Sequence, residues 1–216
     1  LGSWYKETDQ VTRSFFRRGK DMIECSNLCL SFEGRVILNK VSFSLPDSGV
    51  FALMGSSGIG KSSLLKILSG LLAPDSGSIS GLNDLRVGIM FQEDRLLPWH
   101  TALKNVMLAM EHPSQEEARN LLNALEIGGY ADAYPAVLSG GMKRRVALAR
   151  AIGFSSDVLL LDEPFSGIDE QIKGRISPFI QKSASLIIFS THNLKEAAMM
   201  GATNILTLRD EILIKT

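Results

Sequence analysis

Residues 55–62 read Gly-Ser-Ser-Gly-Ile-Gly-Lys-Ser, and this glycine-rich stretch decides the fold. Its glycines let backbone N–H groups turn inward toward phosphate oxygens at the N-terminus of a helix. A short apolar run at residues 49–54 leads into the stretch, and leucines and isoleucine recur at helical spacing over residues 61–71. Strand, loop and helix in this order predict a mononucleotide-binding unit.

The same stretch indicates which residues would contact the phosphates and their metal ion. Lys61 would neutralise the β and γ phosphates, and the Ser62 hydroxyl would be an oxygen ligand for Mg²⁺. The alternative, a plain glycine-rich turn before an amphipathic helix, fits poorly because a strand and a helix both flank the loop correctly. The candidate nucleotide-binding residues here are Gly55, Ser56, Ser57, Gly58, Ile59, Gly60, Lys61, Ser62 and Ser63.

Further along the chain, continuous apolar runs at residues 87–91, 158–161 and 185–190 are typical of parallel strands covered on both faces. Residues 102–110 and 115–125 have helical periodicity instead. These patterns predict an α/β fold with a mainly parallel core sheet. They also predict a helical insertion at about residues 93–150.

The region before the glycine-rich stretch has a different pattern. Apolar and polar residues alternate over residues 22–32 and 41–45, and Glu33-Gly34 between them predicts a turn, so we expect an antiparallel β subdomain. Residues 1–21 show no clean period and are interpreted as an N-terminal extension. We therefore expect one domain over residues 22–216.

Two adjacent carboxylates follow a buried run of four apolar residues. Asp162 and Glu163 stand at the C-terminal end of the predicted strand 158–161, the edge where open α/β sheets bind ligands. Asp162 would hold Mg²⁺ through its water shell, and Glu163 would polarise the attacking water. A surface turn with solvated acids is the alternative.

Composition argues against several classes of protein. The 23 Lys and Arg residues balance 23 Asp and Glu residues, which argues against a nucleic-acid partner. The apolar runs are strand-sized and fall well below the roughly 18 residues of a membrane-spanning helix. Cys25 and Cys29 lie in an alternating run, where small core or surface residues are the simplest interpretation and a reducing cytosol the expected compartment.

The segment Leu138-Ser139-Gly140-Gly141-Met142 and the basic helix after it resemble the signature sequence of ABC ATPases. A serine and two glycines opening a helix form a second anion-binding N-terminus, which one chain does not need for a single nucleotide. The resemblance implies a head-to-tail sandwich of two subunits, in which Ser139, Gly140 and Gly141 of one chain close over ATP held by the other. Lys143, Arg144 and Arg145 are interpreted as a mostly solvated face.

Four further residues resemble motifs of the ABC ATPases in the family's order. The resemblance implies that Gln92 senses Mg²⁺ and the γ-phosphate, that Asp169 crosses the subunit interface and that His192 contacts the γ-phosphate. It also implies that Phe32 stacks on adenine, against the alternative that Phe32 is a core residue at a strand end. Taken singly, Gln92 and His192 would more often be ordinary polar residues at strand ends.

This chain departs from the family pattern in three places. Phe32 stands where tyrosine is commoner, and Gly167 stands where a small alanine is usual. The segment from Asp169 to His192 is also shorter than the pattern, so we expect an abbreviated helix there. These departures concern the subunit interface more than ATP binding.

Residues 93–101, Glu-Asp-Arg-Leu-Leu-Pro-Trp-His-Thr, resemble the same region in ATPases of nitrate, sulfonate and taurine importers. The resemblance implies the ATP-hydrolysing subunit of a membrane importer of small anions, peripheral on the inner face of the cell membrane. Its partners would be permease subunits, a second ATPase subunit and, indirectly, a substrate-binding protein. Trp99 is the expected permease contact, whereas Leu96 fits core packing equally well. An exporter ATPase, or an ABC ATPase acting on nucleic acid or ribosomes, is the alternative.

Overall fold

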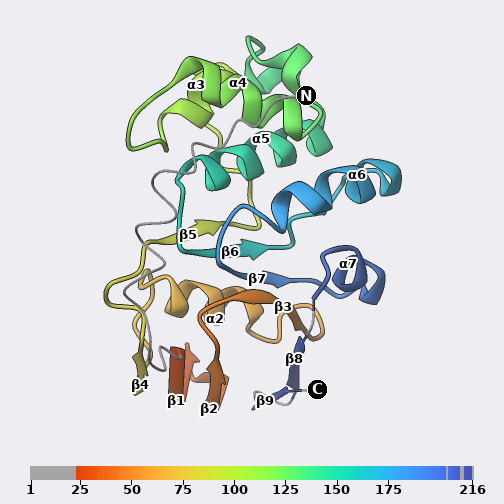
Figure 1. Ribbon diagram of the computed structural model, residues 1–216. Coiled ribbons are helices and arrows are strands. Elements are labelled where there is room, and N and C mark those ends of the chain that lie inside the picture. The colour runs from red at the N-terminus through yellow and green to blue at the C-terminus, as the bar shows by residue number, and fades with distance from the viewer. Residues whose placement is uncertain (1–22, 203, 210–211, 216) are drawn as a thin grey trace.

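Two β-sheets organise the chain, and helices cover the larger sheet on both faces (Figure 1). The computed structural model describes residues 23–202, 204–209 and 212–215, so the predicted extension lies outside the described residues. Within these ranges the larger sheet has six strands in the order β5-β6-β7-β3-β8-β9, and the smaller has three in the order β2-β1-β4.

The larger sheet is parallel except at one end. Strands β6 and β7 are buried along their whole length and consist mainly of leucine and isoleucine, as expected for strands covered on both faces. The last strand, β9, runs antiparallel to β8. These strands are β3 (Gly49–Met54), β5 (Val87–Met90), β6 (Val158–Asp162), β7 (Leu186–Ser190), β8 (Asn204–Arg209) and β9 (Ile212–Lys215).

The alternation of side chains along β6 divides the apolar core in two. Leu159 and Leu161 belong to a cluster with the helices on one face, whereas Val158 and Leu160 pack with α2 (Lys61–Leu68) and the smaller sheet on the other. Figure 1 shows α2 on one side of the sheet, with α5 (Gly140–Gly153) and α6 (Glu170–Ile180) on the opposite side. The glycine-rich loop and the signature helix therefore start from opposite faces of one sheet.

Within the predicted helical insertion, α3 (Ala102–Met107) and α4 (Gln115–Ala124) pack on α5, on its side away from the sheet. Thr101 caps α3 and Ser114 caps α4, accepting hydrogen bonds from the backbone N–H groups of Lys104 and Glu117, each at 3.2 Å. The 3₁₀ turns η1 (Gly128–Tyr130) and η2 (Pro135–Val137) lie between α4 and α5. A short helix, α7 (Leu194–Met199), follows β7.

The smaller sheet is antiparallel, as the alternating pattern predicted, but it is larger than predicted. Strand β2 (Arg35–Leu45) begins directly after the turn, and β1 (Ile23–Phe32) pairs with it on one side. On its other side β1 pairs with β4 (Ser76–Ser80), which the sequence did not suggest because the segment is serine and glycine with one isoleucine.

Two helices are shorter than predicted. Helix α2 stops at Leu68, since Gly70 takes a left-handed φ of +74° that ends a helix. Helix α3 stops at Met107, three residues early. Among the described residues, no helix combines the length and the hydropathy that crossing a membrane requires.

Candidate active site

Adjacent parallel strands of the larger sheet end at the same edge, and this brings the candidate residues that follow them close together. In the parallel pairing Asp162 of β6 lies opposite Ser190 of β7, and Ser190 in turn lies opposite Leu53 of β3. Met90 of β5 pairs with Leu161, so Gln92 emerges at the same edge. The ends of four neighbouring strands thus carry the glycine-rich loop, the carboxylate pair, His192 and Gln92.

The glycine-rich loop runs from the end of β3 into α2. Gly60 caps the helix with φ +113°, and a Cβ there would lie 3.0 Å from the Ile37 carbonyl oxygen, so only glycine fits without strain. No side chain caps the first turn of α2, and that turn contains no acidic residue. Its backbone N–H groups are thus available to an anion.

Lys61 is 6% exposed, and its ammonium is held by the loop itself. Nζ donates to the carbonyl oxygens of Gly55 at 2.8 Å and Ser56 at 2.9 Å, which leaves one of its three N–H groups for a phosphate oxygen. Burial lowers the pKa of Lys61, and the charges of Glu163 and Asp162 oppose part of that shift. A phosphate at this position would act in the same direction as the carboxylates.

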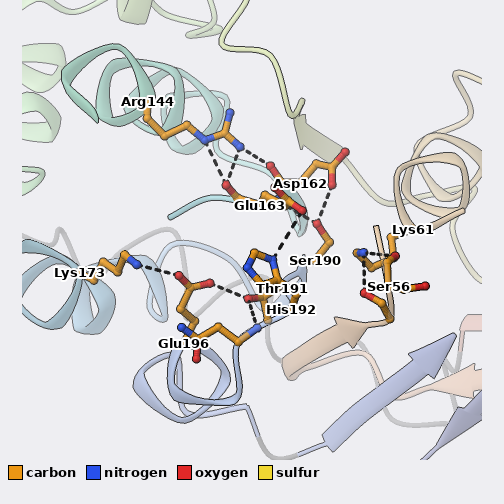
Figure 2. Close-up of polar contacts among 12 residues, drawn as sticks. Ser56, Lys61, Arg144, Asp162, Glu163, Lys173, Ser190, Thr191, His192 and Glu196 are labelled. Carbon is orange, nitrogen blue, oxygen red and sulfur yellow. Dashed lines mark hydrogen bonds and ion pairs between the residues drawn. The ribbon is translucent and has the colours of Figure 1, made fainter. Parts of the chain in front are cut away.

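Ser190 joins the two carboxylate residues at the end of β6. Its fully buried hydroxyl donates to Asp162 Oδ1 at 2.6 Å and accepts from the Glu163 backbone N–H at 2.8 Å (Figure 2). Asp162 is 5% exposed, so this bond fixes the orientation of a buried carboxylate. Glu163 takes a left-handed φ of +49°, and its side chain is 21% exposed.

His192 lies beside Glu163, with Nδ1 at 4.0 Å from Oε1 of the carboxylate. A buried polar chain supports the backbone next to it. The Thr191 hydroxyl donates to Glu196 Oε2 at 2.6 Å, and Lys173 Nζ donates to Glu196 Oε1 at 2.8 Å. Burial alone would lower the pKa of Lys173, but the hydrogen bonds and charges of Glu196 and Glu170 raise it overall. The histidine loop is thereby tied to α6, the helix that Asp169 caps.

The signature segment lies at the surface, away from the glycine-rich loop. Ser139 is exposed and caps α5, its hydroxyl accepting from the Met142 backbone N–H at 3.3 Å. A Cβ on Gly141 would come within 2.5 Å of the Gly167 carbonyl oxygen, so the segment before Asp169 packs directly on this helix turn. Across the described residues, no hydrogen bond joins Ser139 or Asp169 to residues 55–63.

Residues 38–166 match the sequence model of the family described as ABC transporter. The chain belongs to the ABC transporter family. It is an ATPase of that family, as the signature segment predicted.

Similar ABC proteins include several whose names specify import. The chain is 37% identical over 183 residues to an aliphatic sulfonates import ATP-binding protein of Shouchella clausii, covering 83% of this chain and 74% of that protein. It is 36% identical over 187 residues to a taurine import ATP-binding protein of Rhizobium johnstonii, covering 78% and 71%. It is also 36% identical over 198 residues to a sulfate/thiosulfate import ATP-binding protein of Vibrio vulnificus, covering 81% and 57%.

Solved structures confirm the fold class. A dimeric ATP-binding cassette in a post-hydrolysis state, bound to ADP and Pi, superposes with a TM-score of 0.81 at 24% identity, covering 90% of this chain and 97% of that one. This similarity establishes the fold of the ABC ATPase, with its parallel core sheet and antiparallel sheet.

The structure corrects the prediction of a solvated basic face on α5. Arg144 is 3% exposed and Arg145 is 8% exposed, so both are buried. The neighbouring Lys143 is more exposed and is half-buried. Arg145 donates to the carbonyl oxygens of Leu125 at 3.2 Å and Glu126 at 2.5 Å, which follow the end of α4. A planar guanidinium with five N–H groups can satisfy several buried carbonyls at once, so these arginines point inward.

Two open alternatives are also resolved. Phe32 is 68% exposed at the end of β1, so it is not a core residue. Leu96 packs against the core cluster of the helical face, whereas Trp99 is 67% exposed. Both exposed rings are thus available to a ligand or partner.

Sequence reasoning missed Ser190 and Glu196 as parts of the site. Ser190 stands directly opposite Asp162, and this pairing could be found only by aligning the predicted strands 158–161 and 185–190. Glu196 lies on α7 and contacts Thr191 and Lys173, and no sequence pattern indicated these contacts.

Replacing Ser190 should weaken the fold and the site together. Ser190→Ala leaves the Asp162 carboxylate and the Glu163 N–H without their buried partner, which costs about 1–3 kcal/mol of unfolding free energy. Ser183→Ala is the matched control, because its hydroxyl donates to a single carbonyl, that of Ile180, at 2.7 Å. Urea denaturation of both variants checks the prediction, and equal unfolding free energies would contradict it.

Proposed function

We propose that this ABC ATPase drives a membrane importer of small anions such as nitrate, sulfonates or taurine. The observation that carries the ATPase chemistry is the meeting of the glycine-rich loop, the Asp162–Glu163 pair and the polar residues after β5 and β7 at one sheet edge. Relatives named for import of sulfonates, taurine and sulfate or thiosulfate support the importer assignment. Those solutes share an anionic sulfur oxyacid group.

Three oxygen donors at the edge fit a Mg²⁺ ion. The Ser62 hydroxyl, the Asp162 carboxylate and the Gln92 amide are hard ligands of the kind that Mg²⁺ takes, together with several waters. Asp162 suits this role because Ser190 holds its buried carboxylate in one orientation. The ion would neutralise negative charge on the β and γ phosphates, which Lys61 and the first-turn N–H groups of α2 would also contact.

Glu163 is our candidate for polarising the attacking water. Its carboxylate is 21% exposed, so it can face a water molecule at the edge while its backbone stays fixed. His192 is 76% exposed at the end of β7 and would contact the γ-phosphate. Gln92 would contact Mg²⁺ and sense the γ-phosphate, and its position would affect the loop that follows it.

Phe32 is our candidate for stacking on adenine. The turn of the β1–β2 hairpin lies beside the phosphate-binding loop, since the Ile37 carbonyl approaches Gly60 and the neighbouring Val36 pairs with Ser31. An exposed ring at this hairpin offers a flat apolar surface to a base held by its phosphates.

A second copy of the chain would complete the site. Ser139, Gly140 and Asp169 are exposed and share no hydrogen bond with the phosphate-binding loop within the described chain. In a two-fold arrangement Ser139, Gly140 and Gly141 of each subunit would close over ATP bound by the other. The dimeric solved cassette is consistent with such an assembly.

Trp99 is our candidate for docking a permease. Asn105, which is fully buried, fixes the surrounding loop by donating to the carbonyls of Leu97, His100 and Thr101 at 3.1, 3.0 and 3.0 Å. The exposed indole therefore stands on a rigid loop, and a preorganised aromatic residue suits an interface anchor. We place residues 93–150 as the helical subdomain within a domain of residues 22–216.

The permease would bring this subunit to the inner face of the cell membrane. A substrate-binding protein would contact the permease and only indirectly affect the ATPase. The balanced charge of the chain gives no support to a nucleic-acid partner.

Neutral substitutions of the two carboxylates should behave differently. Glu163→Gln keeps the shape of the site but removes the charge that polarises water, so hydrolysis should fall by roughly 10²–10⁴. ATP should then stay intact and hold two subunits together. Asp162→Asn weakens the metal site, so binding of Mg-ATP itself should suffer.

Size-exclusion chromatography with Mg-ATP, beside a phosphate-release assay, separates the two carboxylate variants. Hydrolysis by Glu163→Gln near the wild-type rate would overturn the proposed roles. So would an ATP-bound dimer that accumulates with Asp162→Asn instead.

Trp99→Ala should leave folding and basal ATPase activity unchanged while reducing association with the permease. The reason is that a ring 67% exposed on a fixed loop loses little packing in the free subunit. Co-purification of the tagged subunit with its permease in detergent measures the effect, and Tyr130→Ala, 51% exposed, is the control. Equal recovery of permease by the wild type and Trp99→Ala would count against the docking role.

A further inference from the structure

Arg144 of α5 connects two of the loops at the sheet edge. Its side chain is 3% exposed, and Nη1 donates to the carbonyl oxygens of Phe91 at 2.9 Å and Gln92 at 2.8 Å. The same nitrogen lies 3.1 Å from Asp94 Oδ1, which supplies a counter-charge for the buried guanidinium. The Nη1 side of the forked guanidinium therefore holds the backbone of the Gln92 loop.

The other end of the fork holds the backbone of the carboxylate pair. Nη2 donates to the carbonyl oxygens of Asp162 and Glu163, and Nε donates to the Glu163 carbonyl at 3.2 Å. Figure 2 shows the guanidinium over the Asp162–Glu163 backbone, on the side away from Lys61. A single rigid group thus sets the separation of two loops that come from different strands.

The backbone of Glu163 needs such support. Its φ of +49° is in the left-handed region, which is uncommon for a residue with a side chain and carries a steric cost. The Ser190 hydroxyl accepts from its N–H at 2.8 Å, and Arg144 Nη2 donates to its carbonyl at 2.7 Å. Both polar groups of this residue's backbone are therefore bound by side chains.

We propose that Arg144 is a positioning residue for ATP hydrolysis, which fixes the left-handed backbone at Glu163 and ties it to the backbone of Gln92. The inference rests on the role proposed above for Glu163. Arg144 acts on hydrolysis through the direction of the Glu163 carboxylate, and it touches neither water nor nucleotide itself. A displacement of about 1 Å in a reacting group can cost about 10² in rate, so loss of this fork should reduce turnover.

A second arginine of α5 provides a comparison within the same helix. Arg150 donates to the carbonyl oxygens of Arg95 and Asp94, each at 2.7 Å, and so holds the Gln92 loop without reaching Glu163. If holding that loop were all that mattered, the two arginines would be equivalent. The proposal predicts that they are not.

The test measures kcat and KM for Mg-ATP hydrolysis, with thermal unfolding of each variant. Arg144→Gln should lower kcat by about 10–100-fold and leave KM within about threefold, since the phosphate-binding loop is untouched. Arg144→Lys keeps the charge but cannot span both loops, so its kcat should lie between those of Arg144→Gln and the wild type. Arg150→Gln should lose less kcat than Arg144→Gln.

Two reference variants make the outcome interpretable. Arg119→Gln removes an exposed ion pair with Asp132 on the helical insertion and should match the wild type. Glu163→Gln tests the proposed role of Glu163 separately. If it hydrolyses ATP at the wild-type rate, that role is wrong; if it is inactive while Arg144→Gln keeps its kcat, only the positioning role is wrong.

Other outcomes would also overturn the positioning role. These are an equal loss of kcat in Arg144→Gln and Arg150→Gln, or a rise in KM that accounts for the whole loss of kcat/KM. If Arg144→Gln fails to fold, kcat and KM of Arg144→Lys are measured instead. A loss of kcat at nearly unchanged KM supports the positioning role, and any other result contradicts it. If neither folds at the assay temperature, Arg144 serves folding rather than hydrolysis, and the proposal is wrong.

Discussion

Parallel pairing of β3, β7 and β6 places Leu53, Ser190 and Asp162 in one row across the sheet. Each strand leaves the sheet just beyond that row, so the polar side chains that follow must meet at the same edge. A slip of register by one residue would turn the carboxylate of Asp162 to the other face and move Ser190 away from it. The apolar residues of β6, split between two separate cores, oppose such a slip because both faces are buried.

Backbone carbonyls at this edge have no strand partner, and buried cations supply the missing donors. Lys61 donates to Gly55 and Ser56, while Arg144 and Arg150 donate to the loop after β5. A buried cation is costly unless it is fully hydrogen-bonded, and an unpaired buried carbonyl is costly too. In the part of the chain that the structure describes, no buried side-chain nitrogen or oxygen lacks a partner. The same bonds that satisfy these groups hold the loops in place.

The sequence could predict the features that depend on local pattern. The glycine-rich loop, the order of strand and helix around it and the acidic pair after residues 158–161 follow from composition and spacing alone. The inward direction of Arg144 could not be predicted, because it depends on backbone carbonyls after two strands that are far apart in the sequence. Strand β4 was missed for a related reason, since its serines and glycine pair with β1 without an apolar pattern of their own. The partner-dependent roles of Ser139 and Asp169 stay predictions.

Every role proposed at this edge depends on the binding of nucleotide phosphates where Lys61 meets the end of β3. Calorimetric titration of Mg-ATP into the wild type and Lys61→Ala tests this claim most directly. A compact ammonium facing the β and γ phosphates should contribute much of the affinity, so the wild type should bind and Lys61→Ala should bind far more weakly. Equal affinity of the two proteins for Mg-ATP would contradict the assignment of this edge as the nucleotide site.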